Sequence, residues 1–288
     1  MKDDLATRLS KLAEDRTSGA SELLVDAVAL LRAALARGVV PRPVARELVR
    51  AQPSMAPLWN VVGHALASEN RSSDFERYVA QLERAPRTLA RHAMGVLVTD
   101  EPSRPLHLVT LSFSGTVVTT LQEVMRRREV QVSCGEGQPA LEGRRLAERL
   151  AATGIPVTVY ADGALGQALD TAEAVVVGAD AVSPEWFLNK SGTWMLAAAA
   201  AQRGVPVYVC ASRDKFLSTA IAARLTIRDE PPAEIWPSPP PGVSVRNRYF
   251  ERTPLELVTA VISDLGVLGA ALVPEACPTS HDALLLDL

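Results

Sequence analysis

One short stretch of this chain brings together side chains that could bind and transform a charged small molecule. Asp180 follows the apolar run 174–177, and the sequence Asn189-Lys190-Ser191-Gly192-Thr193 begins nine residues later. The apolar run is typical of a buried parallel strand, and residues 194–201, rich in Ala, Leu and Met, are typical of a helix. We therefore expect Asp180 at the carboxyl end of a strand, the edge where open α/β sheets bind ligands.

The helix that follows Asp180 would favour an anionic ligand. Backbone N–H groups at a helix N-terminus attract anions, and the charge of Lys190 would add to that attraction. A phosphorylated molecule is the ligand that this arrangement predicts. Spacing alone leaves a second interpretation open, in which Asp180 caps a helix, Asn189 fills a turn and Lys190 is solvated.

A glycine-rich turn offers a different kind of ligand. Residues 135–140 read Gly-Glu-Gly-Gln-Pro-Ala, follow an expected strand and precede an expected helix, and Asp162 lies roughly 20 residues farther on. This is a loose form of the dinucleotide-binding pattern. Pro139 and the position of the turn on the second strand of the α/β region argue against it, so we expect no nicotinamide or flavin cofactor.

Composition narrows the classes of partner. The 288 residues carry a formal net charge of −3 and are 48% hydrophobic. There is no basic excess for a nucleic-acid groove, no apolar stretch long enough for a membrane span, and no apolar run in the first twenty residues for a signal peptide. We expect a cytoplasmic protein with no nucleic-acid or membrane partner. The three cysteines and four histidines are widely spaced, so we expect no metal site and structural histidines.

The chain divides into two expected domains. Residues 1–99 show apolar positions at helical spacing, as in 23–34, and predict a helical domain. Residues 100–288 alternate β-branched runs with amphipathic segments, which predicts a Rossmann-like α/β domain with a mostly parallel sheet. The fold class is therefore α/β. The expected strands are 106–112, 129–134, 156–161, 174–177 and 206–210.

Two further segments have clear local signals. Residues 231–242 are too rich in proline for a helix or a central strand, so we expect an extended connection at the surface. Thr253-Pro254 can begin a helix, with Thr253 as N-cap and Pro254 as the first helical residue. We therefore expect a final helix after residue 253.

Seven sets of residues stand in a characteristic order along the chain: 18–23, 112–117, 136–139 with 142–144, 178–180, 189–193, Lys215-Phe216 and 250–254. Together they resemble a known superfamily. It joins the alpha, beta and delta regulatory subunits of translation initiation factor 2B with methylthioribose-1-phosphate isomerase and ribose-1,5-bisphosphate isomerase. The resemblance covers nearly the whole chain. It implies a helical domain, a Rossmann-like domain, a sugar-phosphate pocket between them, and homo-oligomers formed through the C-terminal domain.

The resemblance implies a catalytic pair that is altered in this chain. The isomerases use a Cys and an Asp to open a phosphorylated furanose and to move hydrogen between its first two carbons. Asp180 matches that Asp, and Ser112 stands where the Cys would be. A thiol ionises near neutral pH with modest help, whereas a serine hydroxyl needs a strong adjacent base. Cys134, at the end of a neighbouring strand, is an alternative source of the thiol.

The phosphate contacts implied by the resemblance are altered as well. Ser18 stands where the isomerases tend to carry Arg before Gly19-Ala20, and Gln138 replaces the usual Arg before Pro. Neither side chain reproduces the charged, bidentate fork of Arg. Arg145 aligns best with the isomerase arginine of its helix. The expected substrate-binding residues are Ser18, Gly19, Ala20, Ser114, Arg144, Arg145, Asn189 and Lys190.

Three functions remain open on these residues. Our principal expectation is an aldose–ketose isomerase acting on a phosphorylated pentose, with Asp180 as the acid–base group and Ser112 as a weaker partner. A catalytically silent sensor of a sugar phosphate or nucleotide is the second, because it explains the loss of Cys and Arg beside a retained Asp. The third is a subunit that, like the initiation factor, binds a protein partner.

Overall fold

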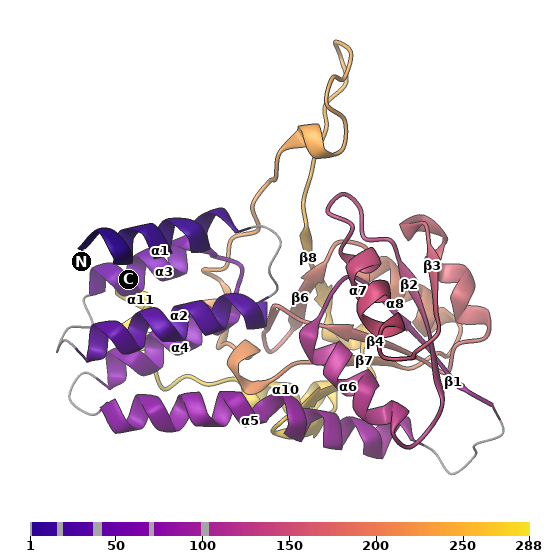
Figure 1. The fold of residues 1–288 in the computed structure, drawn as a ribbon, viewed down its shortest axis with the longest axis horizontal. Coiled ribbons are helices and arrows are strands. Elements are labelled where there is room, and N and C mark those ends of the chain that lie inside the picture. Colours follow the sequence, from indigo (N-terminus) through magenta and orange to yellow (C-terminus); the bar gives the residue numbers. More distant parts are fainter. Residues whose placement is uncertain (1, 16–19, 37–41, 69–71, 99–103) are drawn as a thin grey trace.

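The computed structural model describes residues 2–15, 20–36, 42–68, 72–98 and 104–288. A bundle of helices is followed by a sheet that helices cover (Figure 1). This confirms the expected class, a helical N-terminal region followed by a Rossmann-like region with a mostly parallel sheet. The helices of the bundle are α1 (Lys2–Glu14), α2 (Ala20–Leu35), α3 (Arg42–Ala51), α4 (Ala56–Ala67) and α5 (Ser72–Leu97).

Apolar residues at helical spacing hold the bundle together. Leu23 and Leu31 of α2 and Val62 of α4 are almost completely buried in one core. Burial of one such side chain contributes roughly 1.5–3 kcal/mol. Pro57 is accommodated at the start of α4, because the first amides of a helix have no partner within it. The periodicity of the sequence therefore translates directly into this half of the fold.

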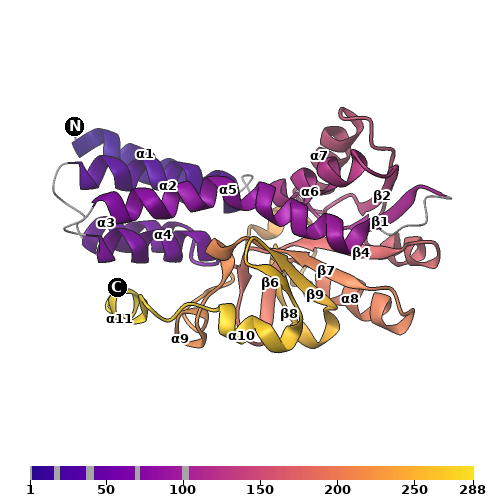
Figure 2. The same ribbon diagram turned by 90° about the horizontal axis from the view of Figure 1, so that it is seen from below.

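Helix α5 connects the bundle to the sheet region. Phe75 and Val79, near its start, join the core of the bundle. Leu89 and Ala93, farther along, join the core under the large sheet, where α5 packs on α6 (Gly115–Met125). Figure 2 shows the helix running from one half of the molecule to the other. The expected boundary at residues 99 and 100 lies outside the described residues and stays a prediction.

The large sheet has seven strands in the order β10-β9-β7-β4-β1-β2-β3, and every neighbouring pair is parallel except β9 and β10. All five strands expected from the β-branched runs are present. Leu108 and Val176, in central strands, are completely buried, as in sheets covered on both faces. The strands are β1 (Leu106–Thr110), β2 (Val130–Gly135), β3 (Val157–Tyr160), β4 (Ala174–Gly178), β7 (Val207–Cys210), β9 (Ala260–Ser263) and β10 (Gly266–Leu268).

The remaining helices are short, and several cover the large sheet (Figures 1 and 2). The α-helices are α7 (Glu142–Ala151), α8 (Thr193–Gln202), α9 (Thr219–Ala222), α10 (Val273–Ala276) and α11 (Asp282–Leu286). The 3₁₀ helices are η1 (Asp162–Asp170), η2 (Arg213–Lys215), η3 (Pro232–Glu234), η4 (Leu255–Leu257) and η5 (Ala270–Leu272). Within the described residues, no helix combines the length and apolar character that a membrane crossing requires.

A second, three-stranded sheet corrects two expectations. It contains β5 (Ala181–Val182), β6 (Trp186–Lys190) and β8 (Phe250–Pro254). Asn189 and Lys190 therefore lie on a strand and not in a strand-to-helix turn. The expected helix after Thr253 is wrong, because β8 pairs with β6 in antiparallel register and the chain continues into the short η4 and strand β9. The side chain of Thr253 is buried in this sheet and does not cap a helix.

The proline-rich connection leaves the body of the molecule. Residues 231–244 are all exposed and form the extended arm between α9 and β8 that projects in orange in Figure 1. At the base of the arm, Glu234 accepts hydrogen bonds from Asn247 Nδ2 (2.8 Å) and from Tyr249 Oη. The expectation of a surface connection is confirmed. These contacts hold Tyr249, which lines the pocket described below.

Candidate functional site

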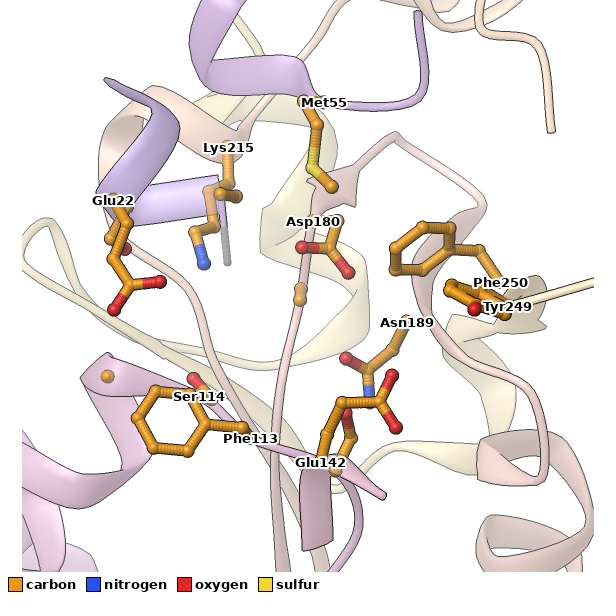
Figure 3. Close-up of a pocket in the computed structure, with 15 residues that line it drawn as sticks. Glu22, Met55, Phe113, Ser114, Glu142, Asp180, Asn189, Lys215, Tyr249 and Phe250 are labelled. Atoms are coloured by element: carbon orange, nitrogen blue, oxygen red, sulfur yellow. The ribbon is translucent and has the colours of Figure 1, made fainter. Parts of the chain in front are cut away.

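A pocket lies between the helical bundle and the carboxyl edge of the large sheet (Figure 3). Its walls come from the N-terminal ends of α2, α4, α6 and α7, the residue pair after β4, strand β6, the turn η2 and the start of β8. Ligands of open α/β sheets bind at this edge. The lining residues are Ala20, Ser21, Glu22, Met55, Ser112, Phe113, Ser114, Gly115, Glu142, Ala179, Asp180, Asn189, Lys215, Tyr249 and Phe250.

The carboxyl group of Asp180 points into this pocket (Figure 3). Its backbone is held on both sides, because its amide donates to Leu188 O (2.8 Å) and its carbonyl accepts from the amide of Ala56 (3.0 Å). Burial raises the pKa of Asp180 to about 6, while Lys215 opposes the rise and Glu142 adds to it. A carboxyl group with this pKa can donate and accept protons near neutral pH.

Lys215 supplies the cation near Asp180. Its side chain is buried, and its ammonium group extends from η2 toward the pocket (Figure 3). In the sequence, Lys215 belongs to a segment that carries the resemblance, but no role was predicted for it. The signal was present: Lys215 stands directly before Phe216-Leu217, at the end of a strand and its turn. A lysine in such a buried segment is expected to have a specific partner.

The turn between β1 and α6 presents a helix N-terminus to the pocket. Ser112 lines the pocket in a left-handed backbone conformation (φ 65°), which is uncommon for a residue other than glycine. Ser114 caps α6, and its Oγ accepts from the amide of Val117 (3.4 Å). A β carbon on Gly178 would lie 2.6 Å from that Oγ, so the glycine makes room for the cap. The N-terminal amides and dipole of α6 favour an anion here.

Lys190 does not line the pocket, although Glu142 and Tyr249 do. Its Nζ donates to both carboxylate oxygens of Glu142, at 2.8 and 3.0 Å, and lies 4.6 Å from the centre of the Tyr249 ring. The Lys190 side chain is 4% exposed and that of Glu142 is 16% exposed. The ammonium group is therefore neutralised by a carboxylate that faces the cavity.

Asn189, the neighbour of Lys190 on β6, lines the pocket directly. Its Nδ2 donates to Thr193 Oγ1 (3.0 Å), and that hydroxyl donates to Lys190 O (2.6 Å). These bonds fix the orientation of the amide, and they leave its carbonyl oxygen as the atom that can accept a bond from a ligand.

The two arginines of α7 lie outside the pocket lining. Arg144 is 57% exposed and pairs with Glu136 at 2.6 Å. The guanidinium group of Arg145 lies 4.6 Å from the centre of the Phe113 ring, and its Nη2 is 4.0 Å from Glu22 Oε2. Because Phe113 and Glu22 line the pocket, Arg145 lies at its rim, whereas the charge of Arg144 is engaged on the surface.

The expected residues of the N-terminal motif are only partly described. Ser18 and Gly19 lie outside the described residues. Ala20, Ser21 and Glu22 form the first turn of α2 and line the pocket. The first turn of a second helix thus faces the cavity, and it carries an acidic side chain.

The glycine-rich turn is filled by the protein's own carboxylate. Asp162 accepts hydrogen bonds from the amides of Gly137 (2.9 Å) and Gln138 (2.7 Å). A pyrophosphate would need amides of this kind, and a dinucleotide fingerprint would need the acidic side chain for ribose. In this structure the amides of the turn and the Asp162 carboxylate are already bonded to each other. This arrangement favours the expectation that the turn binds no dinucleotide.

Cys134 is buried and does not line the pocket. Its Sγ lies 3.7 Å from Gly143 O, and burial raises its pKa to about 11. A thiol in this state is mostly protonated at neutral pH. No cysteine of the described residues lines the pocket, so Cys134 does not replace the missing thiol in this conformation.

Part of the predicted site lines the pocket. Of the expected residues, the pocket brings together Ala20, Ser112, Ser114, Asp180 and Asn189. The pocket is also lined by side chains for which no role was predicted from the sequence: Ser21, Glu22, Met55, Phe113, Glu142, Lys215, Tyr249 and Phe250. Ser21, Glu22, Phe113, Glu142, Lys215 and Phe250 stand inside segments quoted for the resemblance, whereas Met55 and Tyr249 stand outside them.

The histidines have partners elsewhere in the fold. His64 and His281 face each other (3.3 Å), and His107 lies between Ser133 and Thr171. His92 contacts Ser263 O at 2.7 Å. In the part of the chain that the structure describes, no three His, Cys, Asp or Glu side chains are grouped to hold a metal ion.

Known proteins resemble this chain along most of its length. A Pyrococcus horikoshii protein named as eIF-2B subunit 2-like is 29% identical over 227 residues, which span 77% of this chain and 78% of that protein. A methylthioribose-1-phosphate isomerase of Desulforudis audaxviator is 35% identical over 198 residues, or 62% of this chain and 57% of the isomerase. The match thus spans little more than half of that enzyme.

The solved structures agree with the fold. The crystal structure of the Pyrococcus horikoshii OT3 translation initiation factor eIF-2B superposes with a TM-score of 0.79 at 25% identity, covering 92% of this chain and 97% of that one. Residues 19–270 match the initiation factor 2 subunit family. This confirms the resemblance drawn from the ordered segments, and the chain belongs to the initiation factor 2 subunit family.

Proposed function

We propose that this protein binds a phosphorylated pentose in the pocket around Asp180 and interconverts its aldose and ketose forms. The observation that carries this proposal is the Asp180 carboxyl group, which faces the cavity with a pKa raised to about 6. The isomerase name of the Desulforudis audaxviator relative supports the reaction class. Such a reaction needs proton transfer and positioning, and the pocket offers groups for both.

Asp180 can serve both proton transfers of this reaction. Opening the furanose requires a proton on the ring oxygen, which the protonated carboxyl group can donate. A hydrogen then moves with its electron pair from the second carbon to the first, and the hydroxyl of the second carbon becomes a carbonyl by releasing its proton. The Asp180 carboxylate can take that proton back, so protons and electrons balance within one turnover.

The phosphate has a favourable place at the N-terminus of α6. Gly115 opens that helix and lines the pocket, Ser114 contributes a hydroxyl, and Lys215 contributes a buried cation near Asp180. Helix N-termini and charge-assisted donors bind phosphate without an arginine fork. This location would place the sugar toward Asp180 and Asn189.

One observation favours a second candidate, a silent sensor of a sugar phosphate. Ser112 holds the position expected for the thiol, and no described Cys lines the pocket. A serine hydroxyl is a weak acid, so it would contribute far less to proton transfer than a thiol. The pocket would then bind the ligand and report its presence without turnover.

Ligand binding followed by product analysis separates these candidates. Thermal shift against methylthioribose 1-phosphate, ribose 1,5-bisphosphate, other sugar phosphates and AMP should reveal a stabilising ligand, because binding to the native state raises Tm. NMR of each hit should show aldose-to-ketose conversion. Asp180→Asn should retain binding and lose conversion. Asp170→Asn is the control, because Asp170 lies on the surface with Arg203.

Each outcome decides between the candidates. Stabilisation with conversion that Asp180→Asn abolishes supports the isomerase. Stabilisation without conversion supports the sensor, and unchanged conversion in Asp180→Asn refutes the role of that carboxyl group. Absence of stabilisation by every phosphate overturns both candidates and favours a function based on a protein partner.

A further inference from the structure

Glu142 is an acidic side chain at one end of the pocket. It is the first residue of α7, and its carboxylate lies across the cavity from Lys215 (Figure 3). Both of its oxygens accept from Lys190 Nζ, at 2.8 and 3.0 Å. Tyr249 covers the same ammonium group with its ring. Lys190 thus has no contact with the cavity, and the side chain that a ligand meets there is an acidic one.

The two ends of the pocket therefore differ in electrostatic character. Near Lys215 and the first turn of α6, a buried cation and helical amides favour an anion, and the carboxylate of Glu22 at this end lies 4.0 Å from the Nη2 atom of Arg145, which offsets its charge. Among the described residues, the cation that forms an ion pair with Glu142 is Lys190, and its ammonium group is already bound to this carboxylate. A second phosphate at this end would meet negative charge in a site where water screens it weakly. A sugar hydroxyl would instead donate a hydrogen bond to the carboxylate.

We infer that Glu142 is a specificity-determining residue, which occupies Lys190 and restricts the pocket to sugars that carry one phosphate. This inference rests on the proposed function, because it takes the ligand to be a sugar phosphate. The end of the ligand near Glu142 carries hydroxyl or other uncharged groups. A monophosphate is therefore bound at least as tightly as the corresponding bisphosphate, although the bisphosphate carries more charge.

Removing the charge of Glu142 should release Lys190 to a ligand. In Glu142→Gln, the amide retains the size of the side chain but no longer neutralises the ammonium group. The freed lysine can then form a charge-assisted hydrogen bond with a second phosphate. The matched control is Glu136→Gln, which changes the net charge equally but affects a carboxylate that pairs with Arg144 outside the pocket lining.

Calorimetric titration with ribose 5-phosphate and ribose 1,5-bisphosphate tests the inference. The native protein and Glu136→Gln should bind the monophosphate at least as tightly as the bisphosphate. Glu142→Gln should bind the bisphosphate about tenfold more tightly than the native protein does, with less than about a threefold change for the monophosphate. Adding Lys190→Met to Glu142→Gln should remove the gain, because the released cation is then absent.

Other results overturn the inference. Glu142 does not select the ligand if the native protein prefers the bisphosphate tenfold. The same conclusion follows if Glu142→Gln leaves the ratio of the two affinities unchanged. In both cases the proposed binding of a sugar phosphate still stands. A gain that persists without Lys190 assigns the effect to another group and refutes the role given to this pair. Failure of both ligands to bind any of the variants overturns the proposed function together with this inference.

Discussion

Replacing Asp180 with Asn should stabilise the protein at neutral pH. The pKa of this carboxyl group rises from 3.8 to about 6 on folding, chiefly because of burial. A tenfold change in proton affinity corresponds to about 1.4 kcal/mol, so the ionised carboxylate costs the native state about 3 kcal/mol. Asn has nearly the same shape and carries no charge, and this substitution should recover most of that energy.

The pH dependence follows from the direction of the shift. Below pH 3.8 the carboxyl group is protonated in both states and has no effect on the difference. As the pH rises from 3.8 through 6, the unfolded chain releases the proton first, and the native state loses stability relative to it. The advantage of Asp180→Asn should therefore grow from about 1 kcal/mol at pH 4.5 to about 3 kcal/mol at pH 7.5.

Urea denaturation at these two pH values measures the effect. The free energy of unfolding is compared for the native protein, Asp180→Asn and the control Asp170→Asn. Asp170 pairs with Arg203 at the surface, so its replacement should change the free energy by less than about 0.5 kcal/mol at either pH. Two results would refute the reasoning: an Asp180→Asn variant no more stable than the native protein at pH 7.5, or an equal gain in the free energy of unfolding at both pH values. Either result shows that burial does not destabilise the ionised carboxylate.

Two further predictions concern the β2–α7 region. Burial raises the pKa of Cys134 from 9.0 to about 11, so this thiol should react with DTNB at pH 7.5 about 100-fold more slowly than in the urea-unfolded protein. Mass spectrometry locates the labelled cysteine, and rapid labelling of Cys134 would contradict its burial. In Gly143→Ala the new β carbon would lie 1.8 Å from Gly135 O, so the free energy of unfolding measured in urea should fall by more than about 3 kcal/mol. The control Gly163→Ala places its β carbon in open space and should lose less than about 0.5 kcal/mol. Equal losses in the two variants would refute the steric argument.

The local patterns predicted the elements that depend on burial of their own residues. The β-branched runs around Leu108 and Val176 form central strands, and the helical spacing around Leu23 forms a packed helix. Where the outcome depended on a distant partner, the local signal failed. Thr253-Pro254 has the chemistry of a helix start, yet residues 250–254 pair with β6 and form a strand. The hydrogen bonds of that ladder outweigh a local capping preference.

The candidate site shows the same division between local and distant effects. An apolar strand followed by Asp180 indicated a ligand site at the edge of a sheet, and the pocket lies there. The spacing of Asn189 and Lys190 suggested that both face the ligand. Asn189 does, but Lys190 pairs with Glu142, which precedes it by 48 residues in sequence. Nothing in the spacing of the two segments foretells this ion pair.

The order of residues was sufficient for the class of fold, the sequence of its elements and the position of Asp180 at a strand end, because hydrophobic periodicity and backbone preferences act between near neighbours. Only the tertiary structure decided that Lys215 lies near Asp180, that Glu142 holds Lys190, and that Asp180 has a raised pKa. Electrostatic energies and desolvation depend on distances through space and on the depth of burial, which the folded chain alone creates.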